Sequence, residues 1–139
     1  MIDLQLHTTD SDGTWPWKKV LDACLALKLS AFAITDHDTM IRRDEIIAWG
    51  KAHGARAIPG IELSTRENDQ TIHLLGYFLD GKLDNLKKRL QYLKEGRLSR
   101  NEKIIERLRA HGVDVTDDDV KAIAGHNVVG RPHIARLLI

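Results

Sequence analysis

Cysteine, aromatic residues and long apolar runs are all scarce in this chain of 139 residues. A single cysteine, Cys24, excludes an intrachain disulfide framework and fits a reducing compartment, so a cytoplasmic location is expected. No apolar run approaches the roughly 18 residues of a membrane span, and the N-terminus lacks a signal pattern, so no membrane partner is expected. The net charge of +1 gives no overall field for nucleic acid or membranes.

Hydrophobic residues make up 42% of the chain and charged residues 29%, which predicts a soluble globular protein with a real core. Strands and helices alternate over residues 1–81. The predicted strands cover residues 1–6, 30–36, 55–63 and 71–79. The predicted helices cover residues 14–29 and a segment that begins near Asp38 or Thr39 and closes at Gly54. This alternation is typical of βαβ units and favours a parallel sheet.

The pattern changes after Gly81. Leucines and isoleucines at helical spacing predict one long helix that Gly112 stops. A short helix capped by Thr116 follows, and a last helix begins at "GRPH". Residues 1–81 therefore read as part of an α/β domain and residues 82–139 as a helical module.

Four strands are too few for a closed α/β barrel, which needs about 200 residues. The sequence is therefore expected to be a fragment of a longer protein. Exposed barrel edges would then favour self-association.

Metal-ligand side chains gather where the predicted strands end. Strand one leads to His7 and Asp12, strand two to His37, strand three to Glu62, and strand four carries His73. Each residue alone has an ordinary reading as a helix cap or a solvated side chain. Because parallel strands deliver their carboxyl ends to one rim, the coincidence of all four predicts a divalent cation site. Mixed imidazole and carboxylate ligands suit Zn²⁺, Mn²⁺ or Fe²⁺ without choosing among them.

A second signal is basic. Residues 82–109 hold ten Lys or Arg against four Asp or Glu, an excess of six. A solvated helical face is the more usual explanation of such an excess. Arg131 and His133 add cationic groups at a helix start, a favourable place for an anion, although a simple turn with Pro132 explains them equally well. A metal-binding rim beside a basic module suits phosphate ester hydrolysis.

Five stretches together resemble the PHP (polymerase and histidinol phosphatase) family: "DLQLHTTDSDG", "ITDHDT", "IPGIELST", "IHLLGYF" and "GRPHIARLL". The resemblance is greatest to the branch of small metal-dependent phosphoesterases that act on nucleotides, including 3′,5′-nucleoside bisphosphate phosphatases. It implies a distorted (β/α)₇ barrel, here partial, with two or three catalytic metals and a helical insertion matching residues 82–139. It also implies a small phosphorylated substrate.

The resemblance further implies a role for each matching residue. The implied metal ligands are His7, Asp12, His37, Glu62 and His73, with Asp36 as a further ligand or a residue that orients His37. Arg131 and His133 are implied to contact phosphate.

Two departures qualify this assignment. Gln5 stands where the family has the first histidine of H-x-H, so the first metal is expected to be weakly held or absent. The family's later ligands, which follow the insertion, have no counterpart here, so the chain by itself is expected to be weakly active or inactive.

Three functions therefore stay open from the sequence. The first is a phosphatase, or a short-oligonucleotide exonuclease, of the nucleotide-acting branch. The second is a non-catalytic module that binds phosphate or a nucleotide, or that serves a polymerase, which Gln5 favours. The third is an α/β domain without any site, which the convergence at four strand ends opposes.

Overall fold

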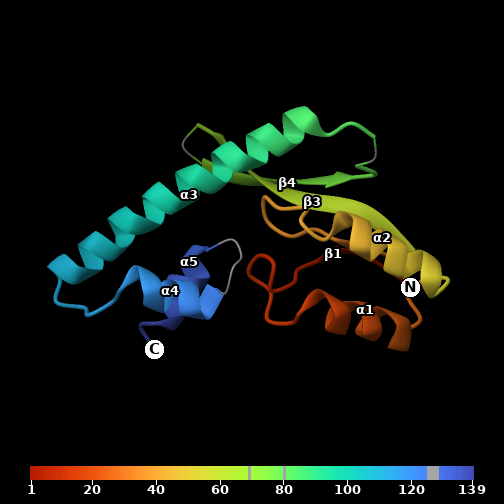
Figure 1. Ribbon diagram of the computed structural model, residues 1–139, viewed down its shortest axis with the longest axis horizontal. Helices are drawn as coiled ribbons and strands as arrows, with labels where there is room; N and C mark the ends of the chain where they lie inside the picture. The colour runs from red at the N-terminus through yellow and green to blue at the C-terminus, as the bar shows by residue number, and fades with distance from the viewer. Residues whose placement is uncertain (69, 80, 125–128) are drawn as a thin grey trace.

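The computed structural model describes residues 1–68, 70–79, 81–124 and 129–139 (Figure 1). Its elements, in chain order, are β1 (Ile2–Leu6), α1 (Trp17–Ala26), β2 (Ala31–Ile34), α2 (Arg43–Ala52), β3 (Arg56–Glu67), β4 (Gln70–Tyr77), α3 (Asp84–Ala110), α4 (Asp117–Ala124) and α5 (Arg131–Arg136). The fold is mixed α/β, as the alternating pattern predicts. No helix among the described residues is long and apolar enough to cross a membrane.

The four strands form one sheet in the order β1-β2-β3-β4. β1, β2 and β3 are parallel, as predicted, but β4 pairs antiparallel with β3, from Gly60 opposite Tyr77 to Glu67 opposite Gln70. The expectation of an all-parallel sheet is therefore wrong for β4. β3 is twelve residues long and only positions 68 and 69 separate it from β4, which is too short for a helical crossover. The two strands make a hairpin instead.

The sheet curls. The Tyr77 hydroxyl on β4 donates a hydrogen bond of 2.9 Å to the Leu4 carbonyl on β1, although these are the two outer strands. In a flat sheet they would lie about 14 Å apart, at roughly 4.8 Å per strand, which exceeds the reach of a tyrosine. Small side chains on the concave face, Ala31 and Ala33, leave room for this curvature. The sheet therefore has the curvature of part of a barrel.

The main core lies on the other face of the sheet. α1 buries Val20, Leu21 and Cys24 at helical spacing against Phe32 and Ile34 of β2. Cys24 is a free, buried thiol, and burial raises its pKa. This core fixes the strands whose ends carry the candidate ligands.

α2 begins at Arg43, later than the predicted start near Asp38. Asp38 has a φ of +52°, outside the helical range, and its carboxylate accepts a 2.7 Å hydrogen bond from the Ser64 backbone nitrogen on β3. The side chain that looked like a helix cap is thus used to fasten a loop to the sheet.

The helical part matches the sequence prediction. α3 runs diagonally across the molecule, with α4 and α5 against its C-terminal half (Figure 1), and it ends before Gly112, whose φ is +81°. Thr116 caps α4: its hydroxyl accepts from the Asp119 nitrogen at 3.1 Å. A small second core holds these helices together and consists of Ile105, Val115, Val120 and Ile134.

Candidate metal centre

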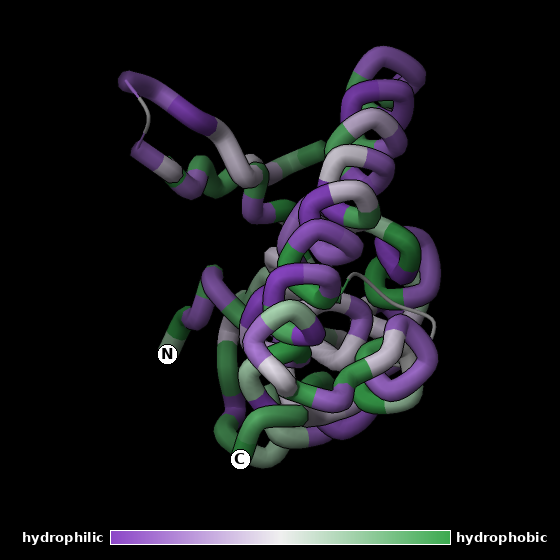
Figure 2. The backbone as a smooth tube through the Cα atoms, turned by 90° about the vertical axis from the view of Figure 1, so that its left-hand side faces the viewer, coloured by the Kyte–Doolittle hydropathy of each residue, from purple (hydrophilic) through white to green (hydrophobic). Residues whose placement is uncertain are grey.

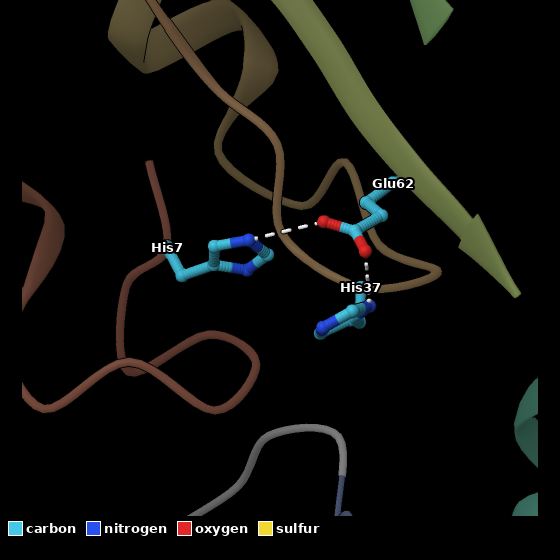
Figure 3. A group of neighbouring side chains, drawn as sticks. All are labelled: His7, His37 and Glu62. Atoms are coloured by element: carbon cyan, nitrogen blue, oxygen red, sulfur yellow. Dashed lines mark ion pairs between the residues drawn. The ribbon is translucent and has the colours of Figure 1, made fainter. Parts of the chain in front are cut away.

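Glu62 lies between the imidazoles of His7 and His37 (Figure 3), and a third imidazole, His73, contacts it from β4. Its Oε2 lies 3.1 Å from His7 Nε2, after β1. Its Oε1 lies 3.7 Å from His37 Nδ1, after β2, and 2.5 Å from His73 Nδ1, on β4. The His37 ring lies 4.8 Å from each of the other two rings, centroid to centroid. The strand ends therefore converge as the sequence predicts.

The antiparallel turn explains how His73 reaches this rim. If β4 were parallel to β3, a residue near the start of β4 would lie at the other end of the strands, away from Glu62. Because β4 runs back along β3, His73 pairs with Ser64, two residues beyond Glu62. The hairpin thus brings a third imidazole to the cluster, by a route that strand periodicity alone does not reveal.

Backbone hydrogen bonds hold His37 beside Glu62. The Asp38 nitrogen donates to the Glu62 carbonyl at 3.0 Å, and the Glu62 nitrogen donates to the Asp36 carbonyl at 3.3 Å. His37 itself forms a parallel bridge with Glu62. The β2–β3 pairing is thereby continued past the end of β2, and the relative position of these two side chains is set by main-chain geometry.

Asp12 joins the cluster from the loop after β1. Its Oδ1 lies 3.5 Å from His7 Nδ1, and its Oδ2 lies 3.5 Å from His37 Nε2. The loop turns tightly beneath it. A Cβ at Gly13 would come within 2.6 Å of the His7 main chain, so only glycine fits here. The "SDG" sequence therefore places a carboxylate between two imidazoles.

Gln5 faces the same carboxylate as His7. Its Nε2 donates a 3.1 Å hydrogen bond to Glu62 Oε2, the oxygen that also lies against His7. The two residues share one side of β1, as period-2 strand geometry predicts. Gln5 thus joins the cluster as a hydrogen-bond donor, through its amide nitrogen, and not as a group that offers a lone pair to a metal.

Asp36 serves the loop instead of the cluster. Its Oδ1 accepts from the Thr8 nitrogen at 2.7 Å and from the Ser11 hydroxyl at 2.6 Å, while its Oδ2 accepts from the Thr8 hydroxyl at 2.8 Å. All three residues are buried. These hydrogen bonds hold the loop that carries His7 and Asp12, which differs from both roles expected for Asp36, a further ligand or a residue that orients His37.

Burial and charge act in opposite directions on the cluster. Burial lowers the pKa of His37, against the opposing effect of the Asp12 and Glu62 carboxylates. Burial would raise the pKa of Glu62, but the hydrogen bond from Gln5 and the neighbouring imidazoles outweigh it and lower that pKa. At neutral pH the site therefore presents an ionised carboxylate and a neutral imidazole, the forms that bind metals.

The residues present fit a divalent cation. Single donor atoms of His7, His37 and Glu62 all lie within 4.8 Å of one another. Within the described residues, the Nδ1 atoms of His7 and His37 are buried without a hydrogen-bond partner, a costly arrangement that a ligand would relieve. Two imidazoles and a carboxylate are a donor set that Zn²⁺, Mn²⁺ and Fe²⁺ accept.

The two predicted phosphate contacts lie in the helical part. His133 is buried, its Nδ1 accepts from the Gly130 nitrogen at 2.9 Å, and burial lowers its pKa. Arg131 is exposed at the start of α5.

Two arginines of α3 were not singled out from the sequence. Arg97 donates to the Asp38 carboxylate and, at 2.7 Å, to the Ser64 hydroxyl, so it links α3 to the loop beside His37. Burial, then the charges of Arg97 and Arg131, lower the pKa of Arg100. The only sequence signal for them was the basic excess of α3, which does not distinguish one cation from the next.

This chain is similar in sequence to known proteins. A family model described as the PHP domain matches residues 3–116. A 5′-3′ exoribonuclease of Haemophilus influenzae is 32% identical over 137 residues, which is 99% of this chain and 50% of that protein. A 3′,5′-nucleoside bisphosphate phosphatase of Chromobacterium violaceum is 30% identical over 139 residues, 99% of this chain and 49% of that protein.

This chain is also similar in fold to solved structures. A protein of Bifidobacterium adolescentis assigned as a metal-dependent phosphoesterase superimposes with a TM-score of 0.89 at 30% identity. The alignment covers 99% of this chain and 49% of that one. The chain thus spans about half the length of the relatives it matches.

Proposed function

The chain belongs to the PHP domain family, and from this premise we propose that it serves metal-dependent hydrolysis of phosphate esters, with 3′,5′-nucleoside bisphosphates or related nucleotides as substrates. The observation that carries the proposal is the convergence of His7, His37 and His73 on the Glu62 carboxylate. The named activities of the relatives, on a nucleoside bisphosphate and on RNA, support the nucleotide class.

We assign cation binding to five side chains: His7, Asp12, His37, Glu62 and His73. The family resemblance implies two or three cations, and Gln5 reduces the number expected here, because its amide donates to Glu62 where an imidazole would offer a lone pair. Manganese, zinc and iron all match the donor set.

A divalent cation in this cluster would neutralise charge on the phosphoryl oxygens and lower the pKa of water. The chain's own residues supply the rest. Glu62 fixes the orientation of the imidazoles, and Asp36 holds the loop that presents His7 and Asp12. Arg131 and His133 bind the phosphate from the helical side, so the substrate lies between the two parts of the chain.

We propose residues 1–81 as the barrel part and residues 82–139 as the helical insertion. The alternative of a non-catalytic module that binds phosphate, or that serves a polymerase, rests on Gln5 alone. The relatives are enzymes by name, and all five proposed ligands are joined by contacts: the three histidines to Glu62, and Asp12 to two of those histidines. The enzyme reading is therefore preferred.

The test combines metal content with phosphate release. Elemental analysis of the chain after dialysis against Mn²⁺ or Zn²⁺ should find at least one equivalent of bound cation. Incubation with adenosine 3′,5′-bisphosphate should release inorganic phosphate slowly, and EDTA should stop it. A metal-loaded chain that releases no phosphate would refute the proposal, and nucleotide binding without phosphate release would support the non-catalytic alternative instead.

A further inference from the structure

Asp38 directly follows the proposed ligand His37 and is almost completely buried. Its Oδ1 accepts a hydrogen bond of 2.7 Å from the Ser64 nitrogen on β3, and its Oδ2 accepts one from the Arg97 guanidinium on α3. Both carboxylate oxygens are therefore already bound. Asp38 also has a φ of +52°, a left-handed conformation that costs free energy in any residue with a Cβ.

The hydrogen-bond ladder between β2 and β3 gives a reason for this conformation. Past the end of β2, the Glu62 nitrogen donates to the Asp36 carbonyl, and the Asp38 nitrogen donates to the Glu62 carbonyl. In a regular parallel ladder, the next bond would run from the Ser64 nitrogen to the Asp38 carbonyl. Here the Ser64 nitrogen donates to the Asp38 carboxylate instead. Because the side chain takes the place of its own main-chain carbonyl, the chain can leave the sheet directly after His37.

Asp38 is thereby joined to the segments that carry three proposed ligands. It adjoins His37 in the chain, and its nitrogen donates to the Glu62 carbonyl at 3.0 Å. Ser64, which its carboxylate binds, lies opposite His73 in the β3–β4 hairpin. The side chains of His37 and Glu62 point toward each other across this junction (Figure 3). One residue therefore sets the spacing between the loop after β2 and the hairpin.

Arg97 binds the same junction from the helical region. Its guanidinium donates to the Asp38 carboxylate and, at 2.7 Å, to the Ser64 hydroxyl. The helix α3 is largely hydrophilic along its length (Figure 2), and Arg97 meets the α/β region through these polar contacts. Because the guanidinium balances the charge of Asp38, the pair adds no net charge beside the cluster. The effect of Asp38 on the cluster is therefore one of geometry.

We propose that Asp38 is a positioning residue of the metal centre, which fixes His37 relative to Glu62 and His73 without binding the cation itself. Two properties of aspartate serve this role. Its short polar side chain tolerates the left-handed conformation, and its oxygen supplies the acceptor for the Ser64 nitrogen. The inference rests on the proposed function, because this centre is the one assigned to metal-dependent hydrolysis.

The test separates the two properties in variants of equal charge. D38N/R97A, D38G/R97A and D38A/R97A each lose one negative and one positive charge, and each lacks the contact with α3. Asparagine keeps the acceptor and the tolerance for a positive φ, glycine keeps only the tolerance, and alanine keeps neither. Asn68→Ala is the control, because it changes another residue with a positive φ, 46°, in the turn between β3 and β4.

Titration calorimetry with Mn²⁺ measures the cation affinity of each variant, and circular dichroism melting confirms that each is folded. We expect D38N/R97A to stay within about threefold of the unmodified chain, D38G/R97A to bind about tenfold more weakly and D38A/R97A about 100-fold more weakly, the range for residues that orient metal ligands. Asn68→Ala should leave the affinity unchanged. A loss in D38N/R97A as large as in D38A/R97A, or equal affinities in all three, would overturn the proposal.

A measurement without metal separates this role from the proposed function. The rings of His37 and His73 lie 4.8 Å apart, so their protons should give a nuclear Overhauser contact. This contact should persist in D38N/R97A and disappear in D38A/R97A. If it does so while no chain binds Mn²⁺, the positioning role stands and the metal-dependent function fails. If all chains bind Mn²⁺ equally and release phosphate from adenosine 3′,5′-bisphosphate, the function stands and the role of Asp38 fails.

Discussion

The α/β region (residues 1–79) and the helical region (residues 82–139) hold their charged groups in different ways. In the α/β region, Glu62 and Asp36 are buried and every oxygen has a hydrogen-bond or ion-pair partner. In the helical region, α3 buries only Asn101 and Ile105 among its 27 residues, and most of its cations are exposed. One region fixes ligand geometry, while the other supplies a positive surface.

The two regions meet at a few named contacts. Arg97 of α3 reaches Asp38 and Ser64, and otherwise the helices have a core of their own around Ile105 and Ile134. Cation binding should therefore depend on the α/β core and tolerate damage to the helices.

Core truncation tests whether the regions are energetically separate. Phe32→Ala should lower the free energy of unfolding by about 4 kcal/mol and abolish metal binding, because Phe32 is fully buried on β2, the strand that leads to His37. Ile105→Ala should cost about 3 kcal/mol and leave metal affinity intact. Chemical denaturation and calorimetric titration with Mn²⁺ measure both. Equal loss of metal binding would show one cooperative unit.

Glu62→Gln removes the charge on which the imidazoles converge. Cation affinity should fall by about 100-fold or more, the upper range for loss of groups that orient metal ligands. The matched control is Glu67→Gln, five residues along the same strand and exposed. Titration calorimetry distinguishes them, and a Glu62→Gln chain that binds Mn²⁺ normally would contradict the assigned centre.

Arg97→Ala breaks the contact between the regions. Because Asp38 is then left buried without its cation, the free energy of unfolding should fall by about 2 kcal/mol. In limited proteolysis, the protease should also cut the loop between β2 and α2, which contains Asp38, more readily. Arg107→Ala, in the last turn of α3, serves as the control. An Arg97→Ala chain as stable as that control would mean that the contact contributes nothing.

Gln5→His should strengthen the centre. The Gln5 amide donates a hydrogen bond to Glu62, whereas an imidazole at this position would offer a lone pair to a cation bound beside Glu62. The substitution should therefore raise cation affinity by about tenfold or add an equivalent of bound metal. Elemental analysis before and after the substitution reports this directly. Gln70→His, at the start of β4, controls for surface histidine binding. Equal metal content in all three chains would remove Gln5 from the site.

The smallest effect concerns α4. Hydrogen bonds from the Thr116 hydroxyl and backbone nitrogen lower the pKa of Asp119. The ionised Asp119 therefore stabilises the fold fully above the ordinary aspartate pKa of 3.8. This stabilisation is lost as the pH falls through the lowered pKa of Asp119 in the folded chain. Hydrogen exchange of α4 amides should accelerate in acid, less so in Asp119→Asn, whereas Asp117→Asn should behave like the unmodified chain.

Much of the site was predictable because strand periodicity is a local property. His7 and Gln5 share a face of β1 by their spacing of two, and Asp12, His37 and Glu62 follow strand ends. The start of α2 could not be predicted, because Asp38 resembles a helix cap in sequence. Its carboxylate instead accepts a hydrogen bond from the Ser64 nitrogen, which requires the folded sheet. Likewise nothing local distinguishes Arg97 from its basic neighbours.

The order and type of the elements and the buried stripe of α1 can be predicted from the amino-acid sequence, because propensity and periodicity act between near neighbours. That β4 turns back along β3, that His73 thereby meets Glu62, and that Arg97 reaches Asp38 can be known only from the folded chain. These depend on contacts between residues far apart in the chain, whose energies arise only when the sheet and α3 are assembled.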